Sequence, residues 1–112
     1  MIAPRLAGPS DYKTLIVCWG STYNVVNEAV KILARDDVAV LHFKQVYPLH
    51  ETTADYLKKA GKTIVIESNA TSQFAKLVKL YTGFVIENKV LKYNGLSFSV
   101  EEVVEKLKGL LN

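Results

Sequence analysis

The stretch that decides the fold runs from Thr14 to Thr22 and reads TLIVCWGST. Its first six residues, Thr14 to Trp19, form a short apolar run typical of a strand that is buried on both faces of a sheet. Gly20 ends the run, and from Thr22 to Ala34 the apolar residues recur at helical spacing. The stretch therefore predicts a buried strand, a tight turn and a helix, which is the opening unit of an α/β fold.

The alternation of strand and helix patterns continues along the rest of the chain. The patterns predict a strand at Val38–Phe43, a short helix from Thr52 or Thr53 to Ala60, a strand at Thr63–Glu67, a helix at Gln73–Tyr81, strand-like pieces at Phe84–Ile86 and Val90–Tyr93 (a hairpin or one interrupted strand), and a last helix from Ser99. The last helix opens on a capping box, with Ser99 and Glu102 as the reciprocal pair. We expect an α/β three-layer sandwich with a mostly parallel, doubly wound sheet of about four to five strands.

Helices cover both faces of such a sheet only if the direction of winding reverses once. We expect the reversal between the strands at Thr14–Trp19 and Thr63–Glu67. The loops Gly20–Thr22 and Ser68–Ser72 then flank the point at which folds of this kind usually bind their ligands.

Length and composition exclude several classes of protein. The 112 residues suffice for one domain, with a linker or extended arm at residues 1–12 and the folded domain at residues 13–112. The net charge of +3 comes from scattered basic residues, which argues against a nucleic-acid surface. The one cysteine, Cys18, lies in the apolar run and reads as a core residue. Since no apolar stretch is long enough to span a membrane or to form a signal peptide, we expect no membrane contact and a cytoplasmic location.

Two loops hold the candidate site residues. Gly20, Ser21 and Thr22 open a helix whose N–H groups and dipole can hold an anion, although a tight turn with a helix cap by Ser21 or Thr22 explains the same residues. The segment has neither the dinucleotide nor the P-loop fingerprint. Glu67 has the chemistry of a general acid or base, but it has no titratable partner in its segment. A role at an interface or in ordering the loop is therefore favoured for Glu67.

The histidines do not form a metal site in the sequence. His42 lies in an apolar strand, and His50 follows shortly after a proline. One cysteine and two separated histidines lack the spacing of metal ligands. We expect both histidines to be structural or exposed.

Four segments in series resemble one protein family. They are LIVCWGST at 15–22, QVYP at 45–48, VIESNATSQ at 65–73 and KYNG at 92–95. Their order and spacing resemble the last domain of the alpha subunit of 2-oxoacid:ferredoxin oxidoreductases, over roughly residues 13 to 105. In one departure, Ser72 stands where the family motif usually has glycine, which concerns the shape of that loop and leaves the fold unaffected.

The resemblance implies a transketolase C-terminal-like domain of a longer alpha subunit, excised or separately encoded. Such a domain shapes a subunit interface and has no catalytic residue of its own. The intact enzyme oxidatively decarboxylates a 2-oxoacid to an acyl-CoA and passes the electrons to ferredoxin. It is expected to use thiamine diphosphate, magnesium, an iron–sulfur cluster and coenzyme A in other domains or subunits, and this domain alone is expected to bind none of them.

The resemblance also names partners and positions. The implied partners are the remaining domains of the alpha subunit, a beta subunit with thiamine diphosphate and an iron–sulfur cluster, and ferredoxin. The positions that match the family's loop motifs are expected to face a site or an interface: Gly20, Ser21, Thr22, Glu67, Asn69 and Gln73.

Three other interpretations stay open. The chain fits the equivalent domain of a transketolase or a 2-oxoacid dehydrogenase, although the segment Gln45–Pro48 favours the ferredoxin-linked branch. It also fits a freestanding anion- or nucleotide-binding module of flavodoxin-like topology. The third interpretation is an interaction domain that dimerises through exposed valine and leucine side chains.

Overall fold

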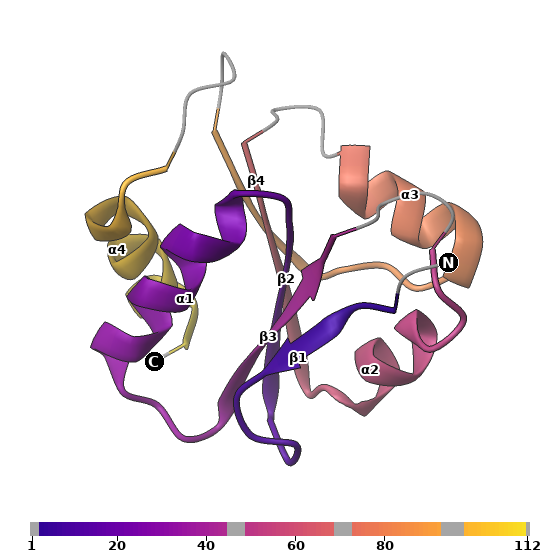
Figure 1. The fold of residues 1–112 in the computed structure, drawn as a ribbon, viewed down its shortest axis with the longest axis horizontal. Coiled ribbons are helices and arrows are strands. Elements are labelled where there is room, and N and C mark those ends of the chain that lie inside the picture. Colours follow the sequence, from indigo (N-terminus) through magenta and orange to yellow (C-terminus); the bar gives the residue numbers. More distant parts are fainter. Residues whose placement is uncertain (1–2, 45–48, 69–72, 93–97, 112) are drawn as a thin grey trace.

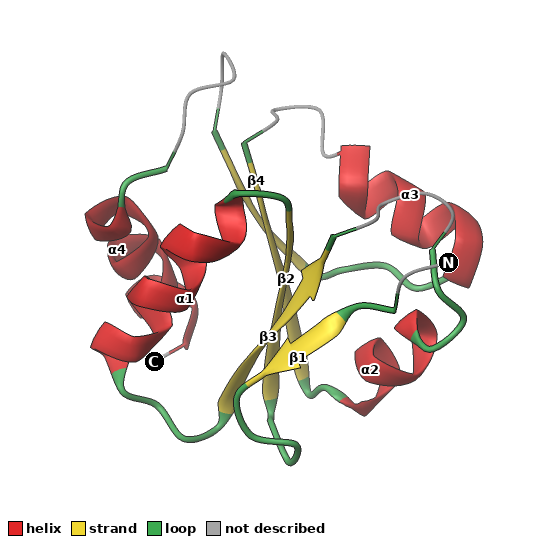
Figure 2. Ribbon diagram, viewed as in Figure 1, coloured by secondary structure: helices red, strands yellow, loops and turns green. Residues whose placement is uncertain are grey.

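The computed structural model describes residues 3–44, 49–68, 73–92 and 98–111, and these fold into three layers (Figure 1). A five-stranded sheet forms the middle layer, with two helices on each side (Figure 2). The strands are β1 (Arg5–Ala7), β2 (Thr14–Trp19), β3 (Val38–Phe43), β4 (Lys62–Glu67) and β5 (Asn88–Leu91). The helices are α1 (Thr22–Leu33), α2 (Thr53–Lys59), α3 (Gln73–Thr82) and α4 (Val100–Leu111). The predicted α/β/α sandwich is confirmed.

The order of the strands is β1-β3-β2-β4-β5, with β2 at the centre. β2 pairs in parallel with β3 on one side and with β4 on the other, and β5 pairs in parallel with β4. The chain therefore winds first to one side of β2 and then to the other. This arrangement confirms the predicted reversal between β2 and β4.

The edge strand β1 has no clear signal in the sequence. It pairs antiparallel with β3, with Leu6 opposite Leu41, so that part of the first twelve residues joins the sheet. Gly8 follows β1 with a φ of +115°, and a Cβ there would lie 3.1 Å from the carbonyl oxygen of Val38. The chain can turn away from β3 at this point only through a residue without a side chain.

The central strand β2 is buried on both faces, as the sequence predicts. Leu15 and Val17 belong to the core shared with α2 and α3, whereas Ile16 and Cys18 belong to the core shared with α1 and α4. Burial raises the pKa of the Cys18 thiol to about 12, so the thiol stays protonated and packs as an apolar group. Cys18 is thus confirmed as a core residue.

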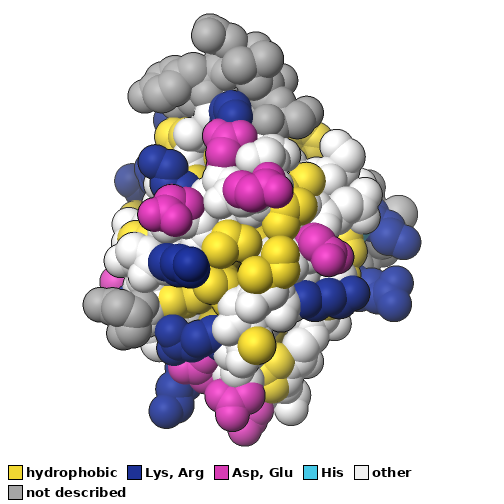
Figure 3. Space-filling model, turned by 90° about the vertical axis from the view of Figure 1, so that its left-hand side faces the viewer, with side chains coloured by type: hydrophobic (Ala, Val, Ile, Leu, Met, Phe, Trp, Pro, Cys, Tyr) yellow, Lys and Arg dark blue, Asp and Glu magenta, His cyan; other side chains and the backbone are white. Residues whose placement is uncertain are grey.

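The outer face of α1 and α4 is the side shown in Figure 3. It carries apolar side chains with basic and acidic side chains around them. Ile32 of α1 is 58% exposed, and Val25 and Val104 are partly exposed on the same two helices. Within the ranges that the structure describes, no helix is both long enough and apolar enough to pass through a membrane.

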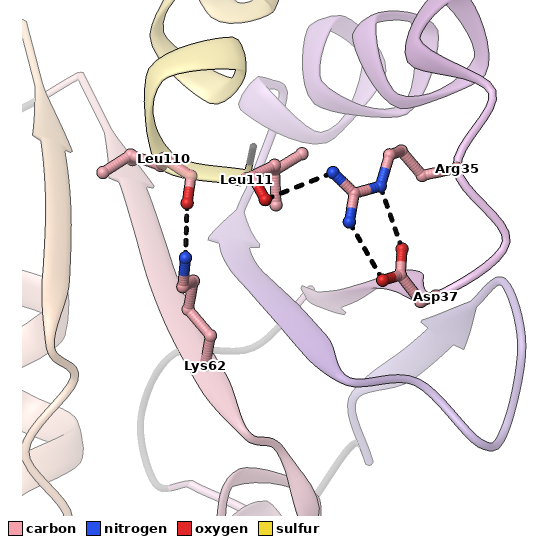
Figure 4. A network of polar contacts seen from close by, with 5 residues as sticks. All are labelled: Arg35, Asp37, Lys62, Leu110 and Leu111. Carbon is pink, nitrogen blue, oxygen red and sulfur yellow. Dashed lines mark hydrogen bonds and ion pairs between the residues drawn. The ribbon is translucent and has the colours of Figure 1, made fainter.

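The carboxyl end of α4 is held by two cations, Arg35 from the connection between α1 and β3 and Lys62 from β4 (Figure 4). Arg35 Nη1 donates to the carbonyl oxygen of Leu111 at 3.2 Å, while Nε and Nη2 donate to the two oxygens of Asp37 at 3.1 and 3.0 Å. Lys62 Nζ, at the start of β4, donates to the carbonyl oxygen of Leu110. Because the last carbonyls of a helix lack partners and carry partial negative charge, these cations fix α4 against β4 and the connection between α1 and β3.

The amino end of α4 carries the predicted capping box. Ser99 Oγ accepts from the amide N–H of Glu102 at 3.1 Å, and the Glu102 carboxylate accepts from the amide N–H of Ser99 at 3.0 Å. Lys92 also donates to this carboxylate, which joins the end of β5 to the start of α4. The pair therefore fixes the helix start locally, independently of the core.

We expect Ser99→Ala to lower the free energy of unfolding by about 1 kcal/mol, because the amide of Glu102 then loses its side-chain acceptor. A urea titration followed by circular dichroism measures the change. Ser99→Asn keeps an acceptor of equal rank and should stay within about 0.5 kcal/mol of the parent. Equal losses in the two variants would show that the cap does not stabilise α4.

Of the two predicted strand-like pieces, only the second contributes to a strand. β5 covers Asn88–Leu91, whereas residues 84–86 are an irregular connection, so the prediction of a strand at Phe84–Ile86 is wrong. Ile86 is buried in the core shared with α2 and α3, which explains the apolar character of this connection. Since Asn88 opens the strand, the hairpin interpretation is excluded as well. Tyr93, like the segment 45–48, lies outside the described residues.

Candidate functional site at the winding reversal

The loops that follow β2 and β4 lie at the same edge of the sheet, where parallel strands end (Figure 1). Ser68 is the last described residue of the second loop, because residues 69–72 lie outside the described ranges. A hollow of about 290 Å³ joins the two loops and is lined by Ser21, Thr22, Asn24, Val25, Ser68 and Phe98. The first predicted loop therefore lies close to Ser68, the start of the second, at the reversal of the winding direction, and the hollow lies between them.

Gly20 makes the turn from β2 into α1. Its φ is +63°, a conformation that favours glycine. Its carbonyl oxygen accepts from the amide N–H of Tyr23 at 3.3 Å. Ser21 occupies the N-cap position, but it has helical φ and ψ of −69° and −16° and makes no side-chain cap. The predicted cap by Ser21 or Thr22 is therefore wrong, since a capping side chain requires a more extended backbone at Ser21 and Thr22 is already the first residue of the helix.

His42, at the end of β3, closes the other side of the turn. Its ring stacks on Tyr23 with the centroids 4.2 Å apart and the planes 12° apart, and its Nε2 donates to the carbonyl oxygen of Gly20 at 3.1 Å. Burial lowers the pKa of His42 below its usual 6.5, the hydrogen bond to Gly20 acts against this, and Lys44 and Arg5 add to the lowering. His42 thus holds the Gly20 turn in place.

We expect a nuclear magnetic resonance titration to give His42 a midpoint below 6.5. Tyr23→Ala should raise this pKa, because the stacked ring keeps water from the imidazole. Since the folded pKa lies below the unfolded one, His42 contributes stability that is present above pH 6.5 and is lost as the pH falls through the folded value. Tyr56→Ala, on the other face of the sheet, is the control, and an equal shift there would contradict the stacking argument.

Glu67, the last residue of β4, is 1% exposed. Its Oε1 accepts from the amide N–H of Phe74 at 2.8 Å, and its Oε2 accepts from the amide N–H of Ala75 at 3.1 Å. Burial raises the pKa of the Glu67 carboxyl above 4.5, and these two N–H groups act against the rise. Both oxygens are engaged by the first turn of α3, so Glu67 ties β4 to α3 across the second loop.

The remaining candidates contribute less to the geometry. Gln73 is the first residue of α3 and is exposed, while Asn69 lies outside the described residues. His50 accepts at Nδ1 from the amide N–H of Thr52 at 3.2 Å, a local bond before α2. In the part of the chain that the structure describes, no three His, Cys, Asp or Glu side chains gather to hold a metal ion. The site thus offers hydroxyl and amide groups around a small hollow.

Asn24 and Phe98 were not apparent as members of this hollow from the sequence. Asn24 lies in the first turn of α1, where a polar residue close to Ser21 and Thr22 is a usable signal. Phe98 comes from the segment before α4, far along the chain, and its position depends on how α4 packs against α1. Local sequence patterns do not encode that contact.

Comparison with known proteins places this fold in a family, although no family model matches the chain. The chain is 30% identical over 104 residues to the alpha subunit of 2-oxoacid:ferredoxin oxidoreductase 1 from Sulfurisphaera tokodaii. It is 32% identical over 103 residues to the corresponding alpha subunit from Aeropyrum pernix. These alignments cover 92% and 88% of this chain but only 16% of each relative. The chain therefore matches a small region of these alpha subunits.

Two solved structures share the fold. The 2-oxoglutarate:ferredoxin oxidoreductase from Magnetococcus marinus, determined with 2-oxoglutarate, coenzyme A and succinyl-CoA bound, matches with a TM-score of 0.87 at 24% identity, over 100% of this chain and 20% of that one. The alpha chain of a probable 2-oxoacid ferredoxin oxidoreductase from Thermoplasma acidophilum matches with a TM-score of 0.67 at 32% identity, over 98% of this chain and 97% of that one. The chain belongs to the family of 2-oxoacid:ferredoxin oxidoreductase alpha chains.

Proposed function

We propose that this chain is a non-catalytic structural and assembly domain of a 2-oxoacid:ferredoxin oxidoreductase. The observation that carries the proposal is the alignment of 92% of the chain with 16% of an alpha subunit, which is the relation of one domain to a larger protein. The enzyme would oxidatively decarboxylate a 2-oxoacid to an acyl-CoA and pass the electrons to ferredoxin. The domain would be residues 13–112, with residues 1–12 as an arm of which Arg5–Ala7 pair with β3.

The hydrogen bonds made by Glu67 and Gly20 support an assembly role. Both carboxylate oxygens of Glu67 accept hydrogen bonds from amide N–H groups of α3, and the carbonyl oxygen of Gly20 accepts one from His42. These contacts hold the Gly20 turn against β3 and join the end of β4 to the first turn of α3. We infer that Gly20, Ser21, Thr22, Glu67, Asn69 and Gln73 form or support a surface against a neighbouring domain, and that the chemistry takes place elsewhere in the enzyme.

Cofactors and partners belong to the same proposal. Thiamine diphosphate, magnesium, an iron–sulfur cluster and coenzyme A would be bound by other domains or subunits. The partners would be the remaining part of the alpha subunit, a beta subunit with thiamine diphosphate and the cluster, and ferredoxin, in the cytoplasm. The transketolase, 2-oxoacid dehydrogenase and flavodoxin-like alternatives are not favoured, because the relatives described above are ferredoxin-linked alpha subunits.

The proposal is tested by isolating the native protein with an antibody raised against this domain. The precipitate is assayed for reduction of a viologen dye that depends on coenzyme A, with a panel of 2-oxoacids as substrates. We expect activity, together with further polypeptide from the same enzyme in the precipitate. A control precipitation blocked with excess purified domain should give no activity. If the antibody recovers the domain but the precipitate shows no 2-oxoacid-dependent dye reduction, the proposal is contradicted.

A further inference from the structure

β5 is the edge strand of the sheet opposite β1. Its outer side has no neighbouring strand among the described residues, so main-chain N–H and C=O groups are open there to another chain. Hollows lie on both sides of this edge. The one on the α3 side measures about 250 Å³ and is lined by Ala75, Lys76, Lys79, Val85, Ile86 and Lys89. The one on the α4 side measures about 530 Å³ and is lined by Lys89, Val90, Leu91, Lys106, Gly109 and Leu110.

Lysines are the charged side chains that line the two hollows at this edge. Lys76 and Lys79 lie on the exposed side of α3, Lys89 lies on β5 itself, and Lys106 lies on α4. No carboxylate lines either hollow, and none of these four lysines forms an ion pair with any residue that the structure describes. The carboxylate of Glu67 offsets part of the charge of Lys76 and Lys89. The linings of both hollows still hold an excess of positive charge, which favours an acidic partner.

We propose that the β5 edge binds an acidic extended segment of another polypeptide, which pairs with β5 as a further strand. Side chains of an added strand alternate between the two faces of the sheet, so one set enters each hollow. Carboxylates on the α3 side meet Lys76, Lys79 and Lys89. Val85, which is 58% exposed, lines that hollow. Leu80, which is 76% exposed, lies one helical turn after Lys76 on α3. Both give the segment apolar contact area.

Two other occupants fit the edge less well. A second copy of this chain would bring the same lysines against these lysines, and like charges across paired edges repel. A small anion would stay mostly in water, because Lys76, Lys79, Lys89 and Val85 are all exposed, whereas small-molecule sites enclose most of their ligand. The inference concerns this surface alone and holds whether or not the enzyme activity proposed above is found.

The test uses the whole chain and a fluorescein-labelled peptide of alternating glutamate and valine. We expect saturable binding by fluorescence anisotropy, and amide resonance shifts centred on Lys89, Val90 and Leu91. The double variant Lys76→Glu/Lys79→Glu should weaken binding by at least about tenfold. The matched control Lys31→Glu/Lys58→Glu changes the charge equally on α1 and α2 and should change affinity by less than about twofold, since those lysines line neither hollow.

Circular dichroism establishes that each variant keeps the fold before its affinity is compared. A peptide of the same charge with proline at its centre should bind at least about tenfold more weakly, since proline cannot complete the strand pairing. Equal binding of the proline peptide, or of single-stranded oligouridylate of the same charge, would overturn strand addition in favour of a simple anion site. Resonance shifts away from β5, or equal weakening by both double variants, would overturn the proposed location.

Discussion

Glu67→Ala is expected to lower the free energy of unfolding by about 2–4 kcal/mol. The alanine variant leaves the amide N–H groups of Phe74 and Ala75 without their carboxylate acceptors and opens space beside a side chain that is 1% exposed. Equilibrium urea unfolding at neutral pH measures the change. The control, Glu28→Ala, removes a carboxylate from the surface of α1 that makes no described hydrogen bond, and it should cost less than about 0.5 kcal/mol. If Glu67→Ala lowered the free energy of unfolding as little as the control does, the capping role would be contradicted.

The pH dependence of stability gives Glu67 a second signature. Its folded pKa is raised above 4.5, so the folded state holds the proton more tightly than the unfolded state. The stability due to the protonated carboxyl is fully present below pH 4.5 and is lost as the pH rises through the folded pKa. The unfolding free energy of the parent minus that of Glu67→Gln should therefore be more positive at acidic than at neutral pH. A difference that is constant with pH would show that burial does not govern this carboxyl.

Phe74→Ala is expected to cost about 3–5 kcal/mol, since it empties an aromatic site in the core. Phe74 is 2% exposed, and its ring packs edge-on against Phe43 with the centroids 4.9 Å apart. Thermal and urea unfolding measure the loss. Leu80→Ala on the same helix is the matched control, because Leu80 is 76% exposed and its truncation should change stability by less than about 0.5 kcal/mol. Similar losses in the two variants would mean that α3 does not pack as described.

The sequence predicts the elements whose signals are local. β2 is recognised from its continuous apolar run, and α4 is recognised from the capping box formed by Ser99 and Glu102. β1 is missed because three residues between Pro4 and Gly8 carry no periodicity, and the strand exists only through pairing with β3. The segment Phe84–Ile86 is misread because an apolar connection that buries Ile86 has the same composition as a strand.

The candidate site is predictable in location but less so in geometry. The strand order follows from the alternation of elements, so the loops after β2 and β4 could be placed at one edge. The partners of Glu67 lie seven and eight residues later and depend on the path of the loop between them. The stack of His42 on Tyr23 depends on the register that sets Cys18 opposite His42 in neighbouring strands. Register and loop path are tertiary properties, and no local pattern encodes them.

The central claim, that this domain assembles the enzyme and takes no part in its chemistry, is tested most directly by the turnover of the assembled enzyme. The triple variant Ser21→Ala/Thr22→Ala/Gln73→Ala removes polar groups of the first loop and of the helix start that follows the second loop. Ser21 makes no cap whose loss would unfold α1. The measurement is kcat for 2-oxoacid-dependent dye reduction per mole of assembled complex. The account predicts a kcat within about twofold of the parent, whatever the yield of complex, whereas a fall of about a hundredfold or more in fully assembled enzyme would contradict it by showing that these loops act in catalysis.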